Sequence, residues 1–526
     1  MAFRQDDPLT AMSATDLHAL LVRREVSAED AARAHLDRII TLDGRVNAFV
    51  AVLRGDALEA ARAIDEQRAR GADVGPLAGL PVTVKENLDF EGRAATLGIV
   101  ARKSKIAKRD ATIVRALKRS GAVILGQTNV PQLLLSHETR NPVYGATSNV
   151  FSRDHAPGGS SGGEASAIGA GMSPAGVGTD IGGSIRVPAT WSGVAGFKPT
   201  LDRWSNRGSN GSMPGQEGVR SQTGPMARSV RDLVLLLCNI DVVAMAADDP
   251  FVPPMPFSDP AEIDPKTLRV GYYVDDGLVT PSAAVARAVM EAALALRERG
   301  VETKPFSPPR MRDAMGLYFG LMSADGGKTA WGQLDGTAIE PTLLPLRRMA
   351  GLPDAVRSTL IRVLRATGEE RPSWLLSQLG EKSVQRLWQL TLAARAYRLE
   401  VLEAMQAAQV DVLVCPAHAT PAVPHTASAQ FQIGGSYSML FNLLQFPAGV
   451  VPVTTVRPSE RVRAGAPQDR FDRVAAAVDE KSAGLPVGVQ VVGRPFADER
   501  ALAVMLALEA AVEGTAGRPV VPRSPA

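Results

Sequence analysis

The chain has 526 residues, with 58 basic and 55 acidic side chains and a formal net charge of +3. It lacks the basic surplus typical of nucleic-acid-binding proteins, so we expect no nucleic-acid partner. Its two cysteines, Cys238 and Cys415, are too few for a disulfide framework or for a zinc site of their own.

Cys238 and Cys415 both lie in apolar runs and are predicted to be buried free thiols, which fits a reducing compartment. The first residues contain acids where a signal peptide would have an apolar stretch, and no apolar run is long enough to span a bilayer. The sequence therefore predicts a cytoplasmic protein.

The first 130 residues alternate helical and strand patterns. Residues 13–40 are predicted to form two helices, with Ser27 as the N-cap of the second, and 54–70 to form a third, amphipathic helix. Shorter elements follow: strands over 80–84 and 122–126, and a helix over 111–120. This alternation indicates a parallel α/β organisation.

Two glycine-rich turns that carry serines stand in the middle of the chain. The first spans 158–163 (GGSSGG), the second spans 182–184 (GGS), and Ser184 comes 24 residues after Ser160 (184 − 160 = 24). Glycine lets backbone N–H groups approach a ligand closely, and several such groups beside a hydroxyl suit an acyl-transfer site built around a serine. A flexible linker is the alternative interpretation, but helical and strand patterns between the turns argue against it.

The second half of the chain follows a proline-rich connector at 250–265. The expected elements around and after it are helices over 229–239 and 282–299 and strands over 268–272, 410–416, 449–453 and 486–493. A two-domain split at the connector is an alternative to one continuous domain. Residues 457–477, rich in Arg, Ala and Asp, are predicted to be a surface loop.

The motifs GGSSGGEA and GTDIGGSIR, with Lys85 upstream in PVTVKEN, resemble the amidase signature family of serine hydrolases, and within it the fatty acid amide hydrolase branch. Four further segments agree with that branch: 127–132, 221–228, 272–276 and 446–456. The resemblance implies an α/β fold with a single domain over 1–526, an α/β/α sandwich whose mixed β-sheet core is flanked by helices. It places the catalytic core at about 80–230, a substrate-channel and membrane-cap region at about 340–445, and suggests a homodimer.

The resemblance also assigns catalytic roles. Ser184 would be the nucleophile, Ser160 a proton relay within an unusual cis peptide, and Lys85 the base and acid. Independently of the resemblance, a lysine at the end of an apolar strand loses hydration, which lowers its pKa toward a range where it accepts a proton. The alternatives are a strand-end lysine that reaches solvent or pairs with Glu86, and Ser161 as the relay.

The same resemblance implies an oxyanion hole formed by four successive backbone N–H groups, those of Ile181, Gly182, Gly183 and Ser184. Thr179 and Asp180 are expected to support this turn at the substrate-binding site, and Arg186 to pair with a nearby carboxylate. No metal ion and no organic cofactor are expected.

A serine–histidine enzyme is the alternative chemistry. Residues 158–162 match the nucleophile-elbow pattern G-x-S-x-G, and the chain has six histidines: His18, His35, His137, His155, His418 and His425. The elbow requires a strand directly before it, whereas 152–157 is a polar turn. Lysine is therefore the predicted base.

The resembled branch suggests hydrolysis of small-molecule acyl amides, namely fatty acyl amides or N-acylethanolamines, to acid and amine through an acyl-enzyme. Leu134 and Leu135, in a run with Leu133, take the place of acyl-channel residues, and His137 stands where that branch tends to have an aromatic residue. The apolar residues expected to extend the channel wall are Phe431, Ile433, Met439, Leu440 and Leu443. Core packing is the alternative for each of them.

Other functions stay open beside the lipid amidase: an aryl or small aliphatic amidase, a carbamate or ester hydrolase, an amidotransferase A-type subunit and an inactive binding scaffold. Residues 343–379 alternate apolar side chains with arginines, and Pro353 and Pro372 are predicted to bound a central helix. This helix either packs on the core as an ordinary amphipathic helix or lies in a membrane interface as a peripheral contact.

Overall fold

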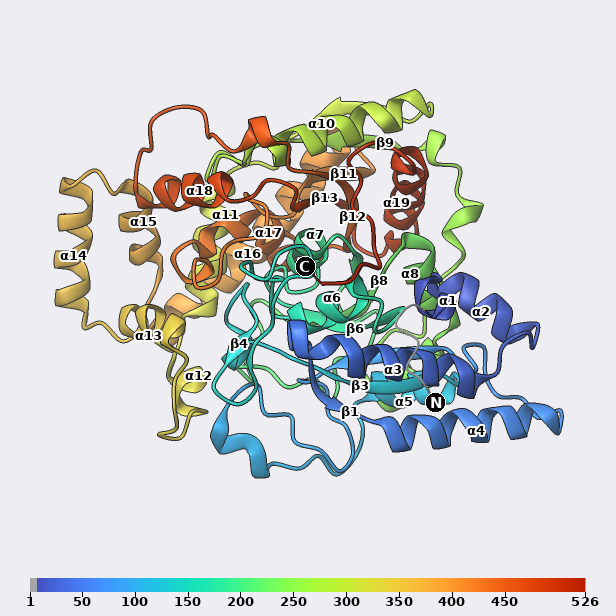
Figure 1. Ribbon diagram of the computed structural model, residues 1–526. Helices are drawn as coiled ribbons and strands as arrows, with labels where there is room; N and C mark the ends of the chain where they lie inside the picture. Colours follow the sequence, from blue (N-terminus) through green and yellow to red (C-terminus); the bar gives the residue numbers. More distant parts are fainter. Residues whose placement is uncertain (1–6, 526) are drawn as a thin grey trace.

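A computed structural model describes residues 7–525, and eleven of its strands form one sheet (Figure 1). From edge to edge these strands are β1 (Phe49–Val52), β3 (Val123–Thr128), β2 (Pro81–Lys85), β6 (Ala175–Asp180), β8 (Gln222–Ala227), β7 (Ala195–Lys198), β12 (Ala448–Thr455), β13 (Pro486–Gly493), β11 (Val412–Pro416), β9 (Arg269–Tyr272) and β10 (Glu302–Pro305). Neighbours run parallel from β3 through β2 to β6 and from β11 through β9 to β10, and antiparallel elsewhere. A separate ribbon pairs β4 (Arg140–Asn141) with β5 (Gly145–Ala146).

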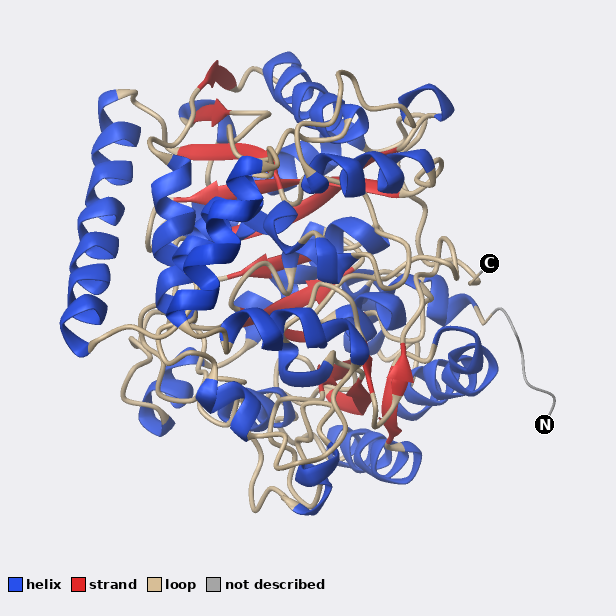
Figure 2. Cartoon of the chain, turned by 90° about the vertical axis from the view of Figure 1, so that its left-hand side faces the viewer, coloured by secondary structure: helices blue, strands red, loops and turns tan. Residues whose placement is uncertain are grey.

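Helices surround this sheet (Figure 2). The first ten are α1 (Pro8–Ala11), α2 (Ala14–Val22), α3 (Ala28–Val46), α4 (Arg54–Ala69), α5 (Thr112–Arg119), α6 (Gly162–Gly169), α7 (Arg186–Ser192), α8 (Val230–Asn239), α9 (Val242–Asp248) and α10 (Ala283–Glu298). The others are α11 (Met311–Met322), α12 (Lys328–Gly332), α13 (Leu344–Ala350), α14 (Asp354–Ala366), α15 (Glu370–Gln378), α16 (Val384–Ala407), α17 (Ser436–Leu443), α18 (Arg470–Glu480) and α19 (Asp498–Val512).

Side-chain alternation along β12 shows that helices cover both faces of the sheet. Val450 packs in a cluster with Ala189 of α7, whereas Val451 belongs to the large core cluster with Leu502 of α19. Because successive strand residues point to opposite faces, α7 and α19 lie on opposite sides of the sheet. The predicted fold class, α/β with a mixed sheet flanked by helices, is confirmed.

Most of the elements predicted from pattern are present. Residues 13–40 do form two helices, α2 and α3, and the side chain of Ser27 caps α3 by accepting the N–H of Asp30. The strands on both sides of the 250–265 connector pair within the one sheet. Both cysteines are free, as expected, but Cys238 is only half-buried, while Cys415 is buried.

Two predictions in the second half are wrong. Residues 457–477 are not all loop, because α18 begins at Arg470, where Asp469 caps its first N–H groups and Phe471 packs inward. Pro372 does not end the central helix of 343–379. Pro353 does precede α14, but that helix ends at Ala366, and Pro372 lies in the first turn of α15, where its missing N–H is tolerated.

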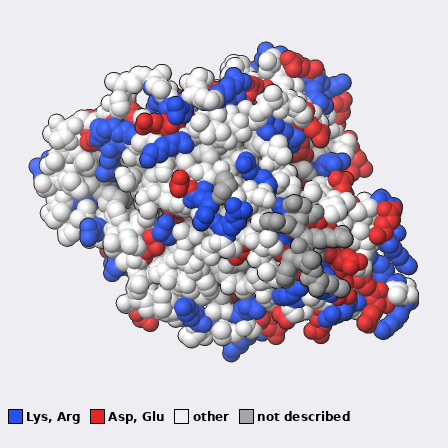
Figure 3. All heavy atoms as spheres, in the orientation of Figure 1, with Lys and Arg blue, Asp and Glu red and all other residues white. Residues whose placement is uncertain are grey.

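Helices α12 to α15 form a projection at the left edge of the molecule in Figure 1. Figure 3 shows this projection as mainly uncharged surface with scattered lysine and arginine side chains. Within it α14 has no buried residue, and Val356, Leu360 and Val363 expose 50%, 37% and 52% of their surface along one stripe. None of the helices in the described part of the chain has the length and apolarity needed to cross a membrane.

Candidate active site

Lys85 is the last residue of β2, a strand whose five residues are all buried. Because β2 runs parallel to both β3 and β6, it delivers Lys85 to the edge of the sheet where these three strands end. Lys85 Nζ donates to Ser160 Oγ (2.7 Å), Thr179 Oγ1 (2.9 Å) and Thr179 O (3.3 Å). The lysine thus points at the first serine of the first glycine-rich turn.

Burial lowers the pKa of Lys85 to about 7, against the opposing attraction of nearby carboxylates, chiefly Asp180. At neutral pH a large fraction of the amine is unprotonated and able to accept a proton. Glu86 does not pair with it, since its carboxylate accepts the Thr96 hydroxyl at 2.5 Å. The alternative of a solvated or Glu86-paired lysine is therefore wrong.

Glu164 fastens the helix that follows the first turn to the strands beside Lys85. Its buried carboxyl group accepts the hydroxyls of Thr83 on β2 and Thr128 on β3. Burial raises its pKa to about 7, although both hydroxyls oppose that rise. Because Glu164 lies in the first turn of α6, these contacts fix the position of the serines directly before that helix.

Ser160 and Ser161 occupy different positions in the first turn, where the Gly159–Ser160 peptide bond is cis. Ser160 Oγ accepts from Lys85, whereas Ser161 Oγ donates to Thr179 O at 3.4 Å. The backbone N–H of Ser161 donates to Ser184 O at 3.1 Å, which holds the second turn against the first. The three residues predicted to be catalytic, Lys85, Ser160 and Ser184, therefore lie close together.

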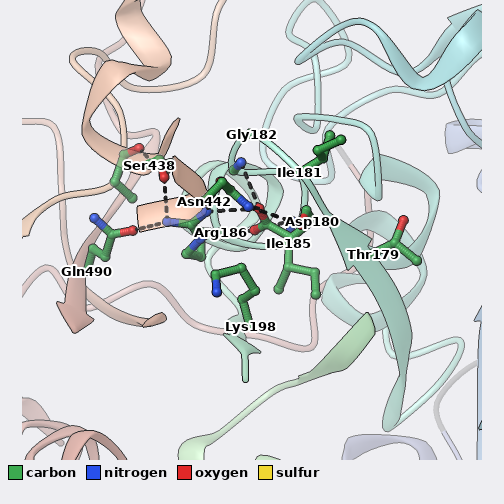
Figure 4. A network of polar contacts seen from close by, with 12 residues as sticks. Thr179, Asp180, Ile181, Gly182, Ile185, Arg186, Lys198, Ser438, Asn442 and Gln490 are labelled. Atoms are coloured by element: carbon green, nitrogen blue, oxygen red, sulfur yellow. Dashed lines mark hydrogen bonds and ion pairs between the residues drawn. The ribbon is translucent and has the colours of Figure 1, made fainter. Parts of the chain in front are cut away.

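Arg186 fixes the second turn through Asp180 (Figure 4). Its wholly buried guanidinium donates to Asp180 Oδ1 at 2.8 Å and Oδ2 at 3.0 Å, and also to Gln490 Oε1 at 2.5 Å and Asn442 Oδ1 at 2.6 Å. Burial by itself would raise the pKa of Asp180, but Arg186 holds it well below its usual range. The expected pairing of Arg186 with a carboxylate is confirmed.

The four amides expected at an oxyanion hole are not equivalent. Ile181, Gly182 and Ser184 line a cavity of about 300 Å³. Gly183 is absent from that lining, and its N–H donates to Asp180 Oδ1 at 2.8 Å. Three of the four residues therefore face the space where a substrate would lie.

Thr179 and Asp180, which were expected at the substrate-binding site, do not line the cavity. The Thr179 hydroxyl contacts Lys85, and the Asp180 carboxylate holds Arg186. Both residues lie behind the turn, where their side chains contact other protein groups and not the cavity.

The cavity that opens from Ser184 is largely apolar. Its apolar lining includes Leu134, Leu135, Tyr318, Phe319, Met322, Pro345, Leu346, Met349, Leu375, Leu379, Ile433, Met439, Phe471 and Val474. Among the described residues that line it, Arg470 alone has a side chain of the Lys, Arg, Asp or Glu type. Four residues predicted for its wall are instead buried outside the lining, as the core-packing alternative states: Leu133, Phe431, Leu440 and Leu443.

The expected channel region at about 340–445 contains α13 and α15, but sequence patterns missed the parts of the wall that α11 and α18 supply. An apolar helix face has the same spacing whether it packs on a core or borders a cavity, so nothing in these helices marks them as cavity walls. His137 was noted in the sequence, but not its contact: its Nε2 lies 3.0 Å from the carbonyl oxygen of Gly182.

The histidines give no support to a serine–histidine pair. In the described residues no histidine is hydrogen-bonded to Ser160 or Ser184, and His155 instead contacts Ser152 Oγ at 2.8 Å. No strand precedes the first turn, because 152–157 is irregular apart from an isolated bridge at His155. The sequence therefore matches the nucleophile-elbow pattern, but the structure lacks the strand that the elbow requires.

Comparison with known proteins shows which family the chain is similar to. Residues 30–502 match the family described as Amidase. The chain is 36% identical over 500 residues to "Fatty acid amide hydrolase 1" of Caenorhabditis elegans, covering 94% of this chain and 87% of that protein. It is 31% identical over 515 residues to "Acetamidase" of Emericella nidulans, covering 94% and 88%. A solved structure titled "Fatty acid amide hydrolase" superimposes with a TM-score of 0.83 at 27% identity, covering 96% of this chain and 86% of that one.

Proposed function

Because the chain belongs to the amidase signature family and is a hydrolase acting on amides, we propose that it cleaves fatty acyl amides or N-acylethanolamines. Ser184 is the proposed nucleophile, Ser160 the proton relay and Lys85 the base. One observation carries these roles: a wholly buried lysine with a pKa of about 7 contacts Ser160 at 2.7 Å, beside a second serine that faces an apolar cavity.

The proposed reaction begins with two proton transfers. Neutral Lys85 accepts the proton of Ser160 Oγ, which takes the proton of Ser184 Oγ as that atom attacks the acyl carbon. The carbonyl π electrons move to oxygen, and backbone N–H groups of the second turn stabilise the oxyanion. When the C–N bond breaks, the proton returns through Ser160 to the leaving nitrogen, so free amine departs and Ser184 is acylated.

Water completes the cycle by the same route. It loses its proton through Ser160 to Lys85 as it attacks the acyl carbon, and the C–O bond to Ser184 then breaks. Ser184 regains a proton and the carboxylic acid leaves. Every step uses groups of this chain and water, so the proposal requires no cofactor.

The lining of the cavity supports a lipid acyl group as the substrate. Its volume of about 300 Å³ falls at the lower end of the range of about 300–1,000 Å³ typical of ligand pockets, and its walls are mostly apolar. The similarity to "Fatty acid amide hydrolase 1" supports the same choice. A small aliphatic amidase is the second candidate, since similarity to "Acetamidase" also covers nearly the whole chain.

A series of acyl amides from acetyl to oleoyl tests the proposed function. We expect kcat/KM to rise with chain length, and Ser184→Ala and Ser160→Ala to lose several orders of magnitude in kcat. Ser161→Ala is the matched control, because this neighbouring serine does not contact Lys85 through its hydroxyl, and we expect a much smaller loss. An optimum at acetamide contradicts the lipid substrate, and an active Ser184→Ala contradicts the nucleophile.

We further propose that the protein is cytoplasmic, with peripheral contact to membranes through α14. The exposed stripe of Val356, Leu360 and Val363 supports this, as do the exposed Arg362 and Arg365 on the same helix. The preceding helix, α13, contributes to the wall of the cavity, so a lipid substrate leaving the bilayer would have a short path to Ser184.

A homodimer is also proposed. Along α16 the side chains of Val384, Trp388, Leu392 and Leu399 are 61–71% exposed, and soluble monomers rarely expose so long an apolar stripe. Sedimentation at twice the mass of the chain is the expected result, and a monomer at micromolar concentration contradicts it.

A further inference from the structure

We infer that Asn442, Tyr318 and His137 are positioning residues for the oxyanion hole, each holding one carbonyl group of the turn that carries the nucleophile. The inference rests on the proposed function and deepens it, because it assigns the hole to particular amides and names the side chains that orient them.

Three successive carbonyl oxygens of the turn accept hydrogen bonds from three side chains. Asn442 Nδ2 donates to Asp180 O at 3.1 Å, and Tyr318 Oη donates to Ile181 O at 3.2 Å. His137 Nε2 lies 3.0 Å from Gly182 O. The donors come from α17, from α11 and from the loop before the first glycine-rich turn, so three separate segments converge on one short stretch of backbone.

A held carbonyl fixes the direction of the next N–H. In a trans peptide unit the C=O and the N–H point in opposite directions. Clamping the carbonyls of Asp180 and Ile181 therefore directs the N–H groups of Ile181 and Gly182 away from Asn442 and Tyr318. Neither N–H makes a hydrogen bond to another group in residues 7–525, and both residues line the cavity.

The third peptide unit is held at both ends. His137 contacts the carbonyl of Gly182, and Asp180 Oδ1 accepts the N–H of Gly183 at 2.8 Å. Gly183 is therefore committed to the turn itself and does not line the cavity. The oxyanion hole consists of the N–H groups of Ile181, Gly182 and Ser184, with Gly183 as their support.

The protonation of the donors fits this role. Burial raises the pKa of Tyr318, so its hydroxyl keeps the proton that it donates. Burial lowers the pKa of His137, so the imidazole is neutral at pH 7, and the neighbouring carbonyl selects the tautomer with hydrogen on Nε2. A side chain at Gly182 would displace the Tyr318 hydroxyl from the carbonyl of Ile181, because its Cβ would lie 2.5 Å from Tyr318 Oη.

Hydrogen bonds to these carbonyls have two effects on catalysis. They hold the N–H groups in place before the oxyanion forms, so little reorganisation is needed as charge develops. They also polarise each peptide unit, which strengthens its N–H as a donor. Both effects act on the transition state far more than on the bound amide. Losing one of these hydrogen bonds should therefore lower kcat and leave KM nearly unchanged.

Tyr318→Phe tests the inference by removing one hydroxyl and leaving the ring in the cavity wall. Its matched control is Tyr397→Phe, because Tyr397 Oη also donates to a backbone carbonyl, that of Pro309 at 2.6 Å, away from the cavity. We expect kcat for oleoyl amide to fall about tenfold in Tyr318→Phe, below the 10²–10³ of losing a direct donor, and to stay within about twofold in Tyr397→Phe. His137→Phe, which retains an aromatic ring without a donor, should lower kcat less than Tyr318→Phe does, because the peptide unit that His137 holds carries the N–H of Gly183, which supports the hole and is not part of it.

Two ligands separate positioning from simple packing. An oleoyl trifluoromethyl ketone adds Ser184 Oγ to its carbonyl carbon and places an oxyanion in the hole, whereas oleyl alcohol fills the cavity without forming one. In Tyr318→Phe the ketone should bind about tenfold more weakly, matching the loss in kcat, and the alcohol should bind as in the wild type.

The outcomes distinguish this inference from the proposed function. Unchanged kcat in Tyr318→Phe, or an equal loss of affinity for ketone and alcohol, overturns the positioning role alone. If the wild type forms no adduct between the ketone and Ser184, the proposed nucleophile is wrong and the inference falls with it. Thermal melting of each variant verifies that the compared proteins are folded.

Discussion

Two lysines, Lys85 and Lys198, are wholly buried, and burial is the main cause that lowers the pKa of each to about 7. Their partners differ. Among residues 7–525, Lys198 Nζ donates only to backbone carbonyls, those of Phe446 at 2.6 Å and Pro199 at 3.1 Å, whereas Lys85 Nζ contacts the hydroxyl of Ser160. Desolvation therefore prepares both amines to release a proton, but only Lys85 has a group from which it can take one.

The pH dependence of catalysis follows from this difference. Below its pKa Lys85 is protonated and cannot accept a proton, so kcat/KM should fall tenfold per pH unit below about pH 7 and level off above it. Lys85→Met should lose several orders of magnitude in kcat at every pH. Lys198→Met is the control: it removes the other buried amine whose pKa is lowered to about 7, and the fall of kcat/KM below about pH 7 should remain unchanged. If the pH at which kcat/KM begins to fall changes in Lys198→Met, the assignment of Lys85 as the base is contradicted.

Which residues of the site can be predicted depends on how far apart in the chain their partners lie. Lys85, Ser160, Ser184 and Arg186 stand in short motifs, and the structure brings them together. Tyr318 contacts a carbonyl 137 residues earlier, and no local pattern indicates such a pair. Contacts of this kind depend on how whole helices dock, which spacing alone does not specify.

At the scale of elements, strongly periodic segments and capped helices were predictable, and α18 shows why one was missed. Its composition is polar, which favoured a loop, but Phe471, Ala475 and Val478 recur at helical spacing and pack inward. Asp469 supplies the N-cap. Spacing and capping were therefore better guides here than composition.

The exposed stripe on α14 predicts a measurable membrane affinity. Replacing Val356, Leu360 and Val363 together by serine should abolish co-sedimentation with anionic liposomes, because it removes the apolar groups that would enter the interface and leaves the arginines. The fold should survive, since no residue of α14 is buried.

A matched control for α14 removes as much exposed apolar surface elsewhere. Val22, Ile40 and Val243 are 53–61% exposed on other helices, and their replacement by serine should leave liposome binding unchanged. Equal losses in both triple variants would show non-specific adhesion. Absence of binding by the wild type would remove the membrane proposal.

At the scale of the whole molecule, Arg186 connects segments that are far apart in the chain. It contacts Asp180 beside it, Ser438 and Asn442 on α17 and Gln490 on β13, which lie 252 to 304 residues away. The turn that carries Ser184 is thus held between early and late parts of the chain. The geometry of the site and the packing of α17 and β13 against the turn therefore depend on the same guanidinium group.

Arg186→Met should therefore cost stability as well as activity. It leaves the Asp180 carboxylate buried without its charge partner, and breaking a buried pair in this way costs about 3–5 kcal/mol. Urea unfolding measures this loss. Arg310→Met removes a half-exposed arginine from its pairs with Asp313 and Glu400 and should cost far less stability, because solvent screens exposed ion pairs. In the double variant Arg186→Met/Asp180→Asn part of the lost stability should return, because no unpaired charge is then buried, while activity should stay low, because the amide of Gly183 has lost its carboxylate acceptor. Equal stability of Arg186→Met and Arg310→Met would show that the buried pair does not connect the two parts of the chain.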